Sequence, residues 1–447
     1  MKKIGFAFFT LLALVFIYYF TSGSAQITKE IKAQVNSEIL NLSQNGFAIE
    51  ERIVKKREEH FVISFKDEKQ IIDFFKKKGA SLNQKDAALL IGMKIGVDLK
   101  YLNDTYSALS MDIYPIALPH SISQSNMRTK EDKLLLAHLN DMLTRKAVLI
   151  HIDFNKLLSS FKGYLKDIHE TINSDKAASL TLQGTTFKGT IEKDKIKTLT
   201  QNVKRISFEV QNELLVQMET ILSTYASTGT SIYDSTAKHQ VQNLRITGIS
   251  KHTQFSISCD NIDTQATTKI QNNLVQSHMQ SSTQKITFRS NNEENTLQDI
   301  HFNFNIHNLD MDTLQSLDSQ TTSNPEERKQ LLQTLFSKGI HMSISPFSAK
   351  TLEINGKKMD GFTLESNLEI SKATQIANLK ANPFELLNII NSKTRVTLSP
   401  ELLTLISKNP KAMLLLMVLK PQSINGKQVF EVELKDGKIT VNGQKML

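Results

Sequence analysis

The chain has 447 residues, 40% of them hydrophobic and 22% charged, so it can bury a large core and wholesale disorder is excluded. The formal net charge is +9, and the basic residues are scattered along the chain. This argues against a nucleic-acid-binding protein, because proteins of that class cluster their basic residues. The single cysteine, Cys259, excludes an intramolecular disulfide and a zinc site built from several cysteines.

The amino-terminal stretch 4–20 carries no charge and follows Lys2 and Lys3. As a helix it would span roughly 25 Å, near the thickness of the apolar core of a bilayer. We therefore predict a membrane anchor in residues 1–25, which makes the protein a single-pass protein of the inner (cytoplasmic) membrane with its body in the periplasm. The residues assigned to the anchor are Ile4, Ala7, Phe9, Leu12, Leu14, Phe16, Tyr18, Tyr19 and Phe20.

A cleaved signal peptide is the alternative interpretation of this stretch, because Gly23 and Ala25 have the small-residue spacing of a cleavage site. Either interpretation exports the residues that follow. The apolar run is longer than that of an ordinary signal peptide, and this length favours the anchor.

Residues 26–46 are predicted to form a helix next to the membrane, since apolar residues from Ile27 to Leu42 recur at helical spacing and Gly46 offers a C-cap. The apolar stripe of this helix is narrow. It can pack on the folded body or on a partner helix, and packing on the body is favoured.

Residues 47–324 are predicted to form a strand-rich periplasmic body, because apolar and polar residues alternate with a period of two. The clearest strands are predicted at Phe47–Val54, 60–65, 91–101, 148–154, 206–210, 255–259 and 300–306. Helices are predicted from Asp67 to Lys78 and over 129–145, with Thr129 as the N-cap of the second. Helix and strand both fit 211–222. Such alternation is typical of an antiparallel sheet with one solvated face.

Residues 325–447 are predicted to be an α+β part of the same body. Asn324 followed by Pro325 predicts a helix that ends at Gly339. The other elements predicted here are a strand at 340–344, a helix at 382–391, a strand at 394–398, a helix near 401–419 that Pro410 interrupts, and hairpin turns at Asn425-Gly426, Asp436-Gly437 and Asn442-Gly443. The predicted fold is α+β, predominantly antiparallel β-sheet with interspersed helices, and one N-terminal transmembrane (signal-anchor) helix.

Two stretches of the carboxy-terminal third, 330–347 (QLLQTLFSKGIHMSISPF) and 435–446 (KDGKITVNGQKM), resemble the YdgA-like family of bacterial envelope proteins. The stretch 309–317 and the short, lysine-led anchor fit the same pattern. The resemblance implies an inner-membrane anchor, a periplasmic body rich in β-structure and no established biochemical activity. It therefore supplies no catalytic residues.

Motifs that carry chemistry are scarce in this chain. It has no phosphate-binding loop, no dinucleotide fingerprint, no nucleophile elbow and no zinc-protease helix motif. His151 and Asp153 share a strand face at roughly 6.6 Å and can form a weak pair, but a polar outer face is the favoured interpretation. Cys259 is interpreted as a small buried hydrophobe. No catalytic, cofactor-binding or metal-binding residue is predicted.

Met413 and Met417 are candidates for lining an adaptable lipid or peptide groove, although ordinary core packing is favoured for both. The leading hypothesis is a non-enzymatic envelope protein that binds an acyl chain or an envelope polypeptide on an extended β-sheet, with inner-membrane lipids as partners and no nucleic acid. A scaffold for other envelope proteins, acting through the amino-terminal helices, is the alternative. A hydrolase is the least favoured hypothesis.

Overall fold

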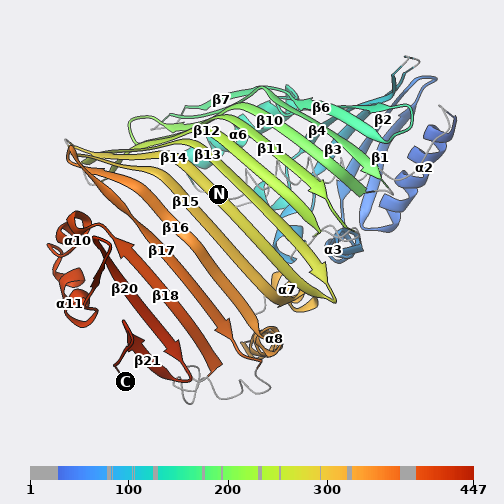
Figure 1. Ribbon diagram of the computed structural model, residues 1–447. Coiled ribbons are helices and arrows are strands. Elements are labelled where there is room, and N and C mark those ends of the chain that lie inside the picture. Colours follow the sequence, from blue (N-terminus) through green and yellow to red (C-terminus); the bar gives the residue numbers. More distant parts are fainter. Residues whose placement is uncertain are drawn as a thin grey trace. The chain divides into compact units, whose positions relative to one another are not determined.

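The computed structural model describes residues 29–77, 82, 84–102, 104, 106–123, 129–173, 177–192, 195–229, 234–250, 253–291, 293–319, 325–372 and 389–446. Within these ranges, 22 strands belong to one large antiparallel sheet (Figure 1). The contacts divide the chain into two compact units. Unit 1 comprises Met1–Glu213 and Glu219–Ser227, and unit 2 comprises Leu214–Met218 and Thr228–Leu447, so that strand β11 (Leu214–Ser227) contributes to both.

The predicted α+β fold with a transmembrane helix is wrong, because the chain is mostly one large antiparallel sheet. The predicted anchor residues in 4–20 lie outside the described residues. No helix in the described part of the chain is both long enough and apolar enough to cross a membrane. The physical reason for the excess of strand is pairing: stretches rich in Ser, Thr, Asn and Gln extend into long strands once both neighbours supply ladder hydrogen bonds. The short strand predicted at 255–259, for example, is part of the 19-residue β13.

Unit 1 is a twisted antiparallel sheet with helices packed on it. Its hydrogen-bonded strand order is β1-β2-β3-β4-β5-β6-β9-β10. Strands β7 and β8 continue the rows of β6 and β9 in the same register, so β7 pairs with β8, and β8 pairs with the far end of β10 on the edge that β9 also uses. Its elements are α2 (Lys29–Gln44), β1 (Phe47–Val54), β2 (Glu58–Phe65), α3 (Glu68–Lys77), α4 (Gln84–Leu90), β3 (Lys94–Tyr101), β4 (Ser107–Ala117), α5 (His120–Ser123), α6 (Lys130–Thr144), β5 (Ile150–Asn155), β6 (Ser160–Leu165), β7 (Ile168–Ile172), β8 (Ala178–Gln183), β9 (Thr185–Glu192) and β10 (Lys195–Val210).

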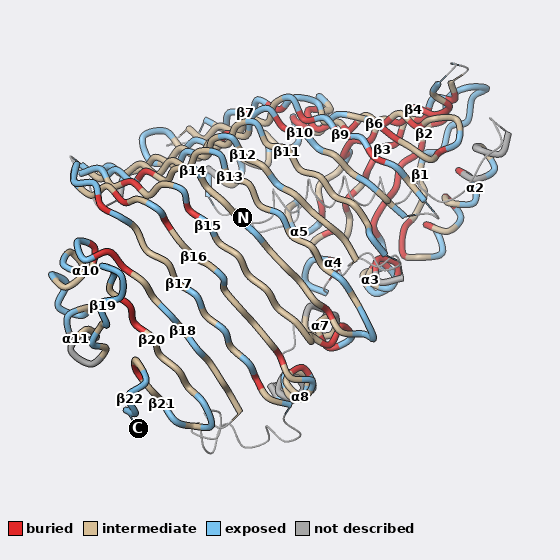
Figure 2. Tube along the Cα trace, in the orientation of Figure 1, coloured by how far each residue is buried: buried red, intermediate tan, exposed pale blue. Residues whose placement is uncertain are grey.

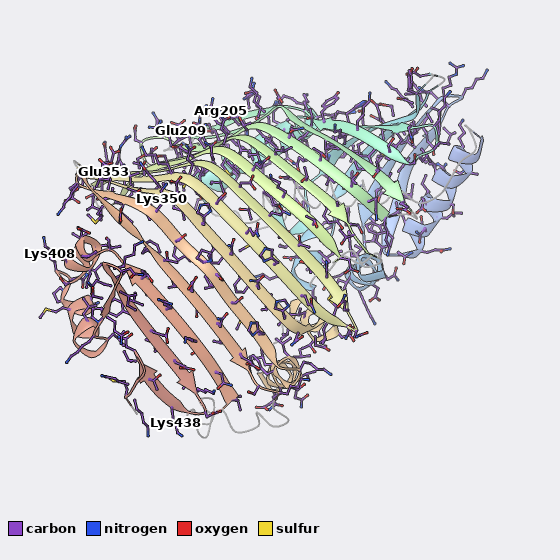
Figure 3. All side chains as sticks on the ribbon, viewed as in Figure 1. Arg205, Glu209, Lys350, Glu353, Lys408 and Lys438 are labelled. Atoms are coloured by element: carbon purple, nitrogen blue, oxygen red, sulfur yellow. The ribbon has the colours of Figure 1, made fainter. Side chains whose placement is uncertain are left out.

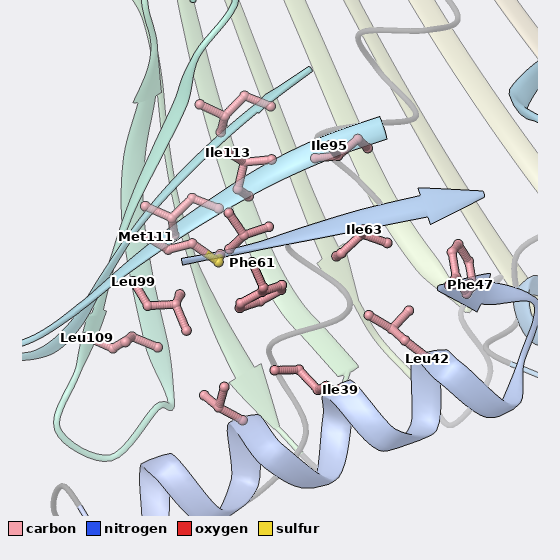
Figure 4. Close-up of a cluster of buried hydrophobic side chains, with 14 of the residues drawn as sticks. Ile39, Leu42, Phe47, Phe61, Ile63, Ile95, Leu99, Leu109, Met111 and Ile113 are labelled. Atoms are coloured by element: carbon pink, nitrogen blue, oxygen red, sulfur yellow. The ribbon is translucent and has the colours of Figure 1, made fainter. Parts of the chain in front are cut away.

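The core of unit 1 lies between its sheet and its first helices. Val35, Ile39 and Leu42 of α2 are buried against the strands, so the helix predicted at 26–46 packs on its own unit (Figure 4). The apolar stripe that the scaffold hypothesis assigns to a partner is therefore used internally. The predicted cap of α6 is confirmed, since Thr129 Oγ1 accepts a hydrogen bond from the backbone N–H of Asp132 at 3.1 Å.

Unit 2 is a ladder of long antiparallel strands in the order β12-β13-β14-β15-β16-β17-β18-β20-β21-β22, with β19 also paired to β20. Its elements are β12 (Ser235–Ser250), β13 (Thr253–Gln271), β14 (Leu274–Ser290), β15 (Glu293–Asp310), α7 (Met311–Ser319), α8 (Pro325–Ser337), β16 (Ile340–Ile354), β17 (Lys357–Ile370), β18 (Ile390–Leu398), α10 (Pro400–Ile406), α11 (Pro410–Val418), β19 (Gln422–Ile424), β20 (Lys427–Lys435), β21 (Lys438–Val441) and β22 (Gln444–Lys445).

Several local predictions in unit 2 are confirmed. Helix α8 begins at Pro325, and two helices, α10 and α11, replace the interrupted 401–419 segment. The stretch 211–222, for which the sequence left helix and strand open, is strand from Leu214 onwards, in β11, which both units share. The three predicted hairpin dipeptides all have positive φ at both residues, for example 50° at Asn425 and 76° at Gly426. The helix predicted at 382–391 lies mostly outside the described residues, and its last two positions belong to strand β18.

Candidate functional site

An apolar belt crosses the middle of the unit 2 sheet and is the first candidate site. Strand register places Phe302 opposite Phe347, Phe347 opposite Leu364, and Leu364 opposite Val396. The adjoining row places Met279 opposite Phe304, and Phe304 opposite Ile344. The seven residues of the belt are Met279, Phe302, Phe304, Ile344, Phe347, Leu364 and Val396. Their side chains share one face because each row follows directly opposed residues of neighbouring strands.

A β-bulge in β16 brings Phe347 onto the belt. Ile344 and Phe347 are three residues apart, and in a regular strand an odd spacing would place them on opposite faces. The register shift between them sets Ser345 and Pro346 against the single residue Asn303, so Phe347 returns to the face of Ile344. Asn303 Nδ2 donates to the Ser345 carbonyl at 3.0 Å and satisfies the bulged backbone. Strict alternation in the sequence therefore could not find Phe347.

Aromatic contacts connect the residues of the belt with one another. The rings of Phe302 and Phe304 lie parallel with centroids 6.4 Å apart, and Phe302 meets Phe347 edge-to-face at 6.0 Å. Phe347 in turn contacts Phe362 at 5.2 Å. All seven belt residues are nevertheless only half-buried, and Figure 2 shows the middle of strands β14 to β18 as mainly intermediate in exposure. The belt is therefore an accessible apolar surface.

Helices bury the sheet of unit 2 at the two ends of this face and leave the belt between them. At one end, Leu402 of α10 packs on Leu398 and Phe430. At the other end, Leu335 of α8 packs on Ile340 and Ile370. Side chains project from these strands along their whole length (Figure 3). The two covered ends give the belt a defined extent.

Met413, one of the two methionines predicted as groove candidates, is not part of the belt. Met413 lies on α11 with its side chain exposed. The side chain of Met417 lies outside the described part of the structure. Leu416 and Leu419, on the same segment, are the residues that pack against the cluster under α10. The methionine that does lie on the belt is Met279, which no sequence motif singles out.

A polar row on the sheet of unit 1 is the second candidate site. Strand register aligns His60, Asp98, Asp112 and His151 as directly opposed residues of β2, β3, β4 and β5. His60 Nδ1 lies 2.6 Å from Asp98 Oδ1, and His151 Nδ1 lies 2.6 Å from Asp112 Oδ1. The weak pair expected between His151 and Asp153 is present at 3.3 Å. The stronger partner, Asp112, comes from another strand, so no local pattern in the sequence points to it.

Tyr114 and Lys146 interact with each other and with Asp98 of the polar row. Lys146 Nζ lies 3.4 Å from Asp98 Oδ2 and 3.5 Å from the centre of the Tyr114 ring. Partial burial opposes ionisation of Asp98, but hydrogen bonds from His60 and Tyr114 outweigh it and lower the pKa of this carboxyl. Burial likewise opposes the charge on Lys146, yet Tyr114 and Asp98 raise its pKa. Both groups are therefore held in their charged forms.

The polar row does not form the catalytic arrangement of a hydrolase. The hydrogen bonds that the His60 and His151 rings make within the described ranges go to carboxylates, whereas acyl transfer needs a hydroxyl or thiol beside the base. Burial and the neighbouring Asp260 raise the pKa of the Cys259 thiol, which disfavours the reactive thiolate. Among the described residues, no cluster of three or more His, Cys, Asp or Glu side chains is arranged to hold a metal ion.

No protein-family profile matches this chain, and a search of curated proteins finds no significant relative. The resemblance of the carboxy-terminal third to the YdgA-like family therefore stays a prediction.

Proposed function

We propose that the protein works by binding rather than by catalysis, and that the apolar belt of unit 2 takes the acyl chain of a membrane lipid. The observation that carries this proposal is the belt itself: aromatic and aliphatic side chains, half-buried, between two ends that helices cover. A contiguous apolar surface that stays accessible in the folded protein marks an interaction site.

The backbone of the sheet favours an acyl chain over a polypeptide. Strands β14 to β17 are paired on both sides, so their N–H and C=O groups are already used in the ladder. A polypeptide lying on this face would leave its own backbone groups without partners, which costs free energy. An acyl chain has no such groups, and each methylene that it buries contributes about 0.8 kcal/mol.

The hydroxyl groups beside the belt do not need a polar ligand. Ser366 Oγ and Thr394 Oγ1 lie 2.8 Å apart, and Thr264 Oγ1 and Ser281 Oγ lie 2.9 Å apart. Each pair is satisfied across neighbouring strands. An apolar chain can therefore cover them without leaving an unpaired hydroxyl group.

The inner membrane is the proposed source of the lipid. Residues 4–20, which precede the described part of the chain, are uncharged and follow two lysines. Such a stretch supports export and residence at the inner membrane, with the two units in the periplasm. The resemblance to YdgA-like envelope proteins supports the same location.

The test is lipid capture by the full chain. Protein purified from its own host should carry lipid in native mass spectra, and a fluorescent fatty acid should bind and be displaced by unlabelled palmitate. Phe304→Asp places a charge on the belt and should weaken fatty-acid binding by about tenfold or more, equivalent to 1.4 kcal/mol or more. His301→Asp is the matched control, because His301 is an exposed residue of the same strand, β15, and lies on the other face.

Equal affinities of the Phe304→Asp and His301→Asp proteins would contradict a site on the belt. Absence of both bound lipid and fatty-acid binding in the unmodified chain would overturn the proposed function. Circular dichroism of both variants should show unchanged β-structure, so that a loss of binding reports the surface and not the fold.

A further inference from the structure

Three hairpin connections of unit 1 lie at the same end of its strands. They join β1 to β2, β3 to β4 and β5 to β6, and antiparallel pairing places all of them at one edge of the unit. The Tyr101 N–H donates to the Arg57 carbonyl at 2.8 Å and connects the first two. Pairing of Ser107 with Asn155 places the third beside the second.

Large apolar side chains are exposed at this edge. Tyr106 is 81% exposed, Leu157 60%, Val54 57% and Ile53 55%. Each comes from a hairpin connection or from the last residues of the strand before it. Such side chains can add nothing to the core of unit 1, which is otherwise densely packed. We call these four apolar residues and the basic residues around them the tip surface. The basic residues are Lys55, Lys56, Arg57, Lys100 and Lys156.

Positive charge surrounds these apolar residues. Lys55, Lys56, Arg57 and Lys100 are exposed, and Lys156 is partly exposed beside Leu157. Among the described residues of these three hairpins, the exposed acidic ones are Glu58 and Asp104, while Glu59 is buried. The tip surface therefore combines an excess of basic side chains with protruding apolar ones, which is the composition of a surface that enters the head-group region of a bilayer.

The amino-terminal part of the chain joins the molecule at the same edge. Helix α2 runs antiparallel to β1, which it packs against (Figure 1), and Lys32 in its first described turns donates to the Lys56 carbonyl at 2.9 Å. Arg52 of β1 donates to the Asn36 side chain, one turn further along α2. The amino-terminal end of α2 therefore lies beside the tip surface.

We propose that the tip surface is a membrane-contact surface, which inserts Tyr106 and Leu157 into the interface of a bilayer rich in anionic phospholipid while its lysines contact the head groups. Burial of the apolar side chains and attraction of the basic ones act together there. This proposal does not depend on lipid binding by the belt, which lies in the other unit.

The absence of tryptophan from the chain allows a direct test. Tyr106→Trp and Leu157→Trp each introduce a single fluorophore on the tip surface of the full-length protein. The matched control is Tyr164→Trp, because Tyr164 is also an exposed aromatic residue of unit 1 but lies on the face of β6, level with the polar row. The purified variants are reconstituted into phosphatidylglycerol-containing vesicles with or without bromine on the acyl chains.

Brominated chains should quench the indole fluorescence of the Tyr106→Trp and Leu157→Trp proteins several-fold more strongly than that of the Tyr164→Trp protein. The emission of the two tip variants should also shift to the blue. Equal quenching in all three proteins, or none in the two tip variants, would overturn the proposal.

The charge of the tip surface is tested in the Tyr106→Trp protein. Lys55→Glu combined with Lys56→Glu should lower the quenching of that protein, because the basic side chains no longer attract anionic head groups. Replacing phosphatidylglycerol by phosphatidylcholine in the vesicles should lower the quenching of the protein that keeps both lysines. Unchanged quenching in both experiments would exclude recognition of anionic lipid.

Discussion

The two units have the same alternating strand pattern, but the apolar faces of their sheets are buried to different extents. In unit 1 helices cover the sheet, and the twelve largest side chains with less than 2% exposure, from Phe61 to Ile168, all lie there. In unit 2 buried residues gather in one cluster under α10 and another under α8. Where no described helix covers the strands of unit 2, the apolar side chains of the belt stay half-buried.

Shortening an aromatic side chain should have the largest effect on stability, and the loss should be greater in unit 1 than in unit 2. Phe61→Ala removes a fully buried ring from unit 1 and should destabilise it by about 3–5 kcal/mol. Phe304→Ala removes a half-buried ring from the belt and should cost less, about 1–2 kcal/mol, since that ring is partly exposed to water in the folded protein. Hydrogen exchange followed by mass spectrometry measures the protection of backbone amides in each unit separately. Equal losses of protection in β2 and β15 would contradict the assignment of the belt as an open surface.

The second prediction concerns a buried ionic network in unit 1. This network links α2 to the strands through Arg52, which donates to the Asn36 side chain. Glu59 is buried, bonded to Arg52 at 2.6 Å and to the Tyr101 hydroxyl at 3.0 Å. Glu59→Gln removes the charge from the hydrogen bonds with Arg52 and Tyr101 and should cost about 2 kcal/mol by chemical denaturation followed by circular dichroism. Glu58→Gln, at the adjacent exposed position, should change stability by less than about 0.5 kcal/mol. Similar costs for both would show that the network adds nothing to the packing of α2.

The smallest expected effect concerns the polar row. The pKa of Asp98 is lowered in the folded protein, so its ionisation stabilises the fold above the ordinary carboxyl pKa of about 4, and this stability is lost as pH falls through the lowered value. Asp98→Asn should remove that part of the acid-induced loss, less than about 1 kcal/mol because the carboxyl is partly exposed. The acid dependence is checked by measuring the midpoint of chemical denaturation from pH 5 to pH 2, at intervals of about one pH unit. An unchanged acid dependence would show that the row is not coupled to folding.

Local signals in the sequence predicted local structure well. Thr129 caps its helix, Pro325 begins another, and the three Asn-Gly and Asp-Gly dipeptides form turns with positive φ. These features depend on a few neighbouring residues, so they can be read without the fold. The fold class was predicted wrongly, because the length of strands such as β13 depends on partners elsewhere in the chain.

The candidate sites were mostly hidden from the sequence. His60 and Asp98 are 38 residues apart, and Asp112 and His151 are 39 apart, so only strand register brings them together. Phe347 reached the belt through a bulge that no alternation predicts. The one contact of this row that could be predicted, between His151 and its neighbour Asp153, lies within a single strand.

By itself, the sequence determined which residues alternate along each strand, where the chain turns, which helices can begin, and that an uncharged stretch stands at residues 4–20. Those properties follow from the chemistry of residues close together in the chain. The tertiary structure decided which strands are neighbours, in which register, and which apolar faces are covered. Pairing and covering join residues far apart in the sequence, so the exposed belt and the tip surface become visible only in the folded protein.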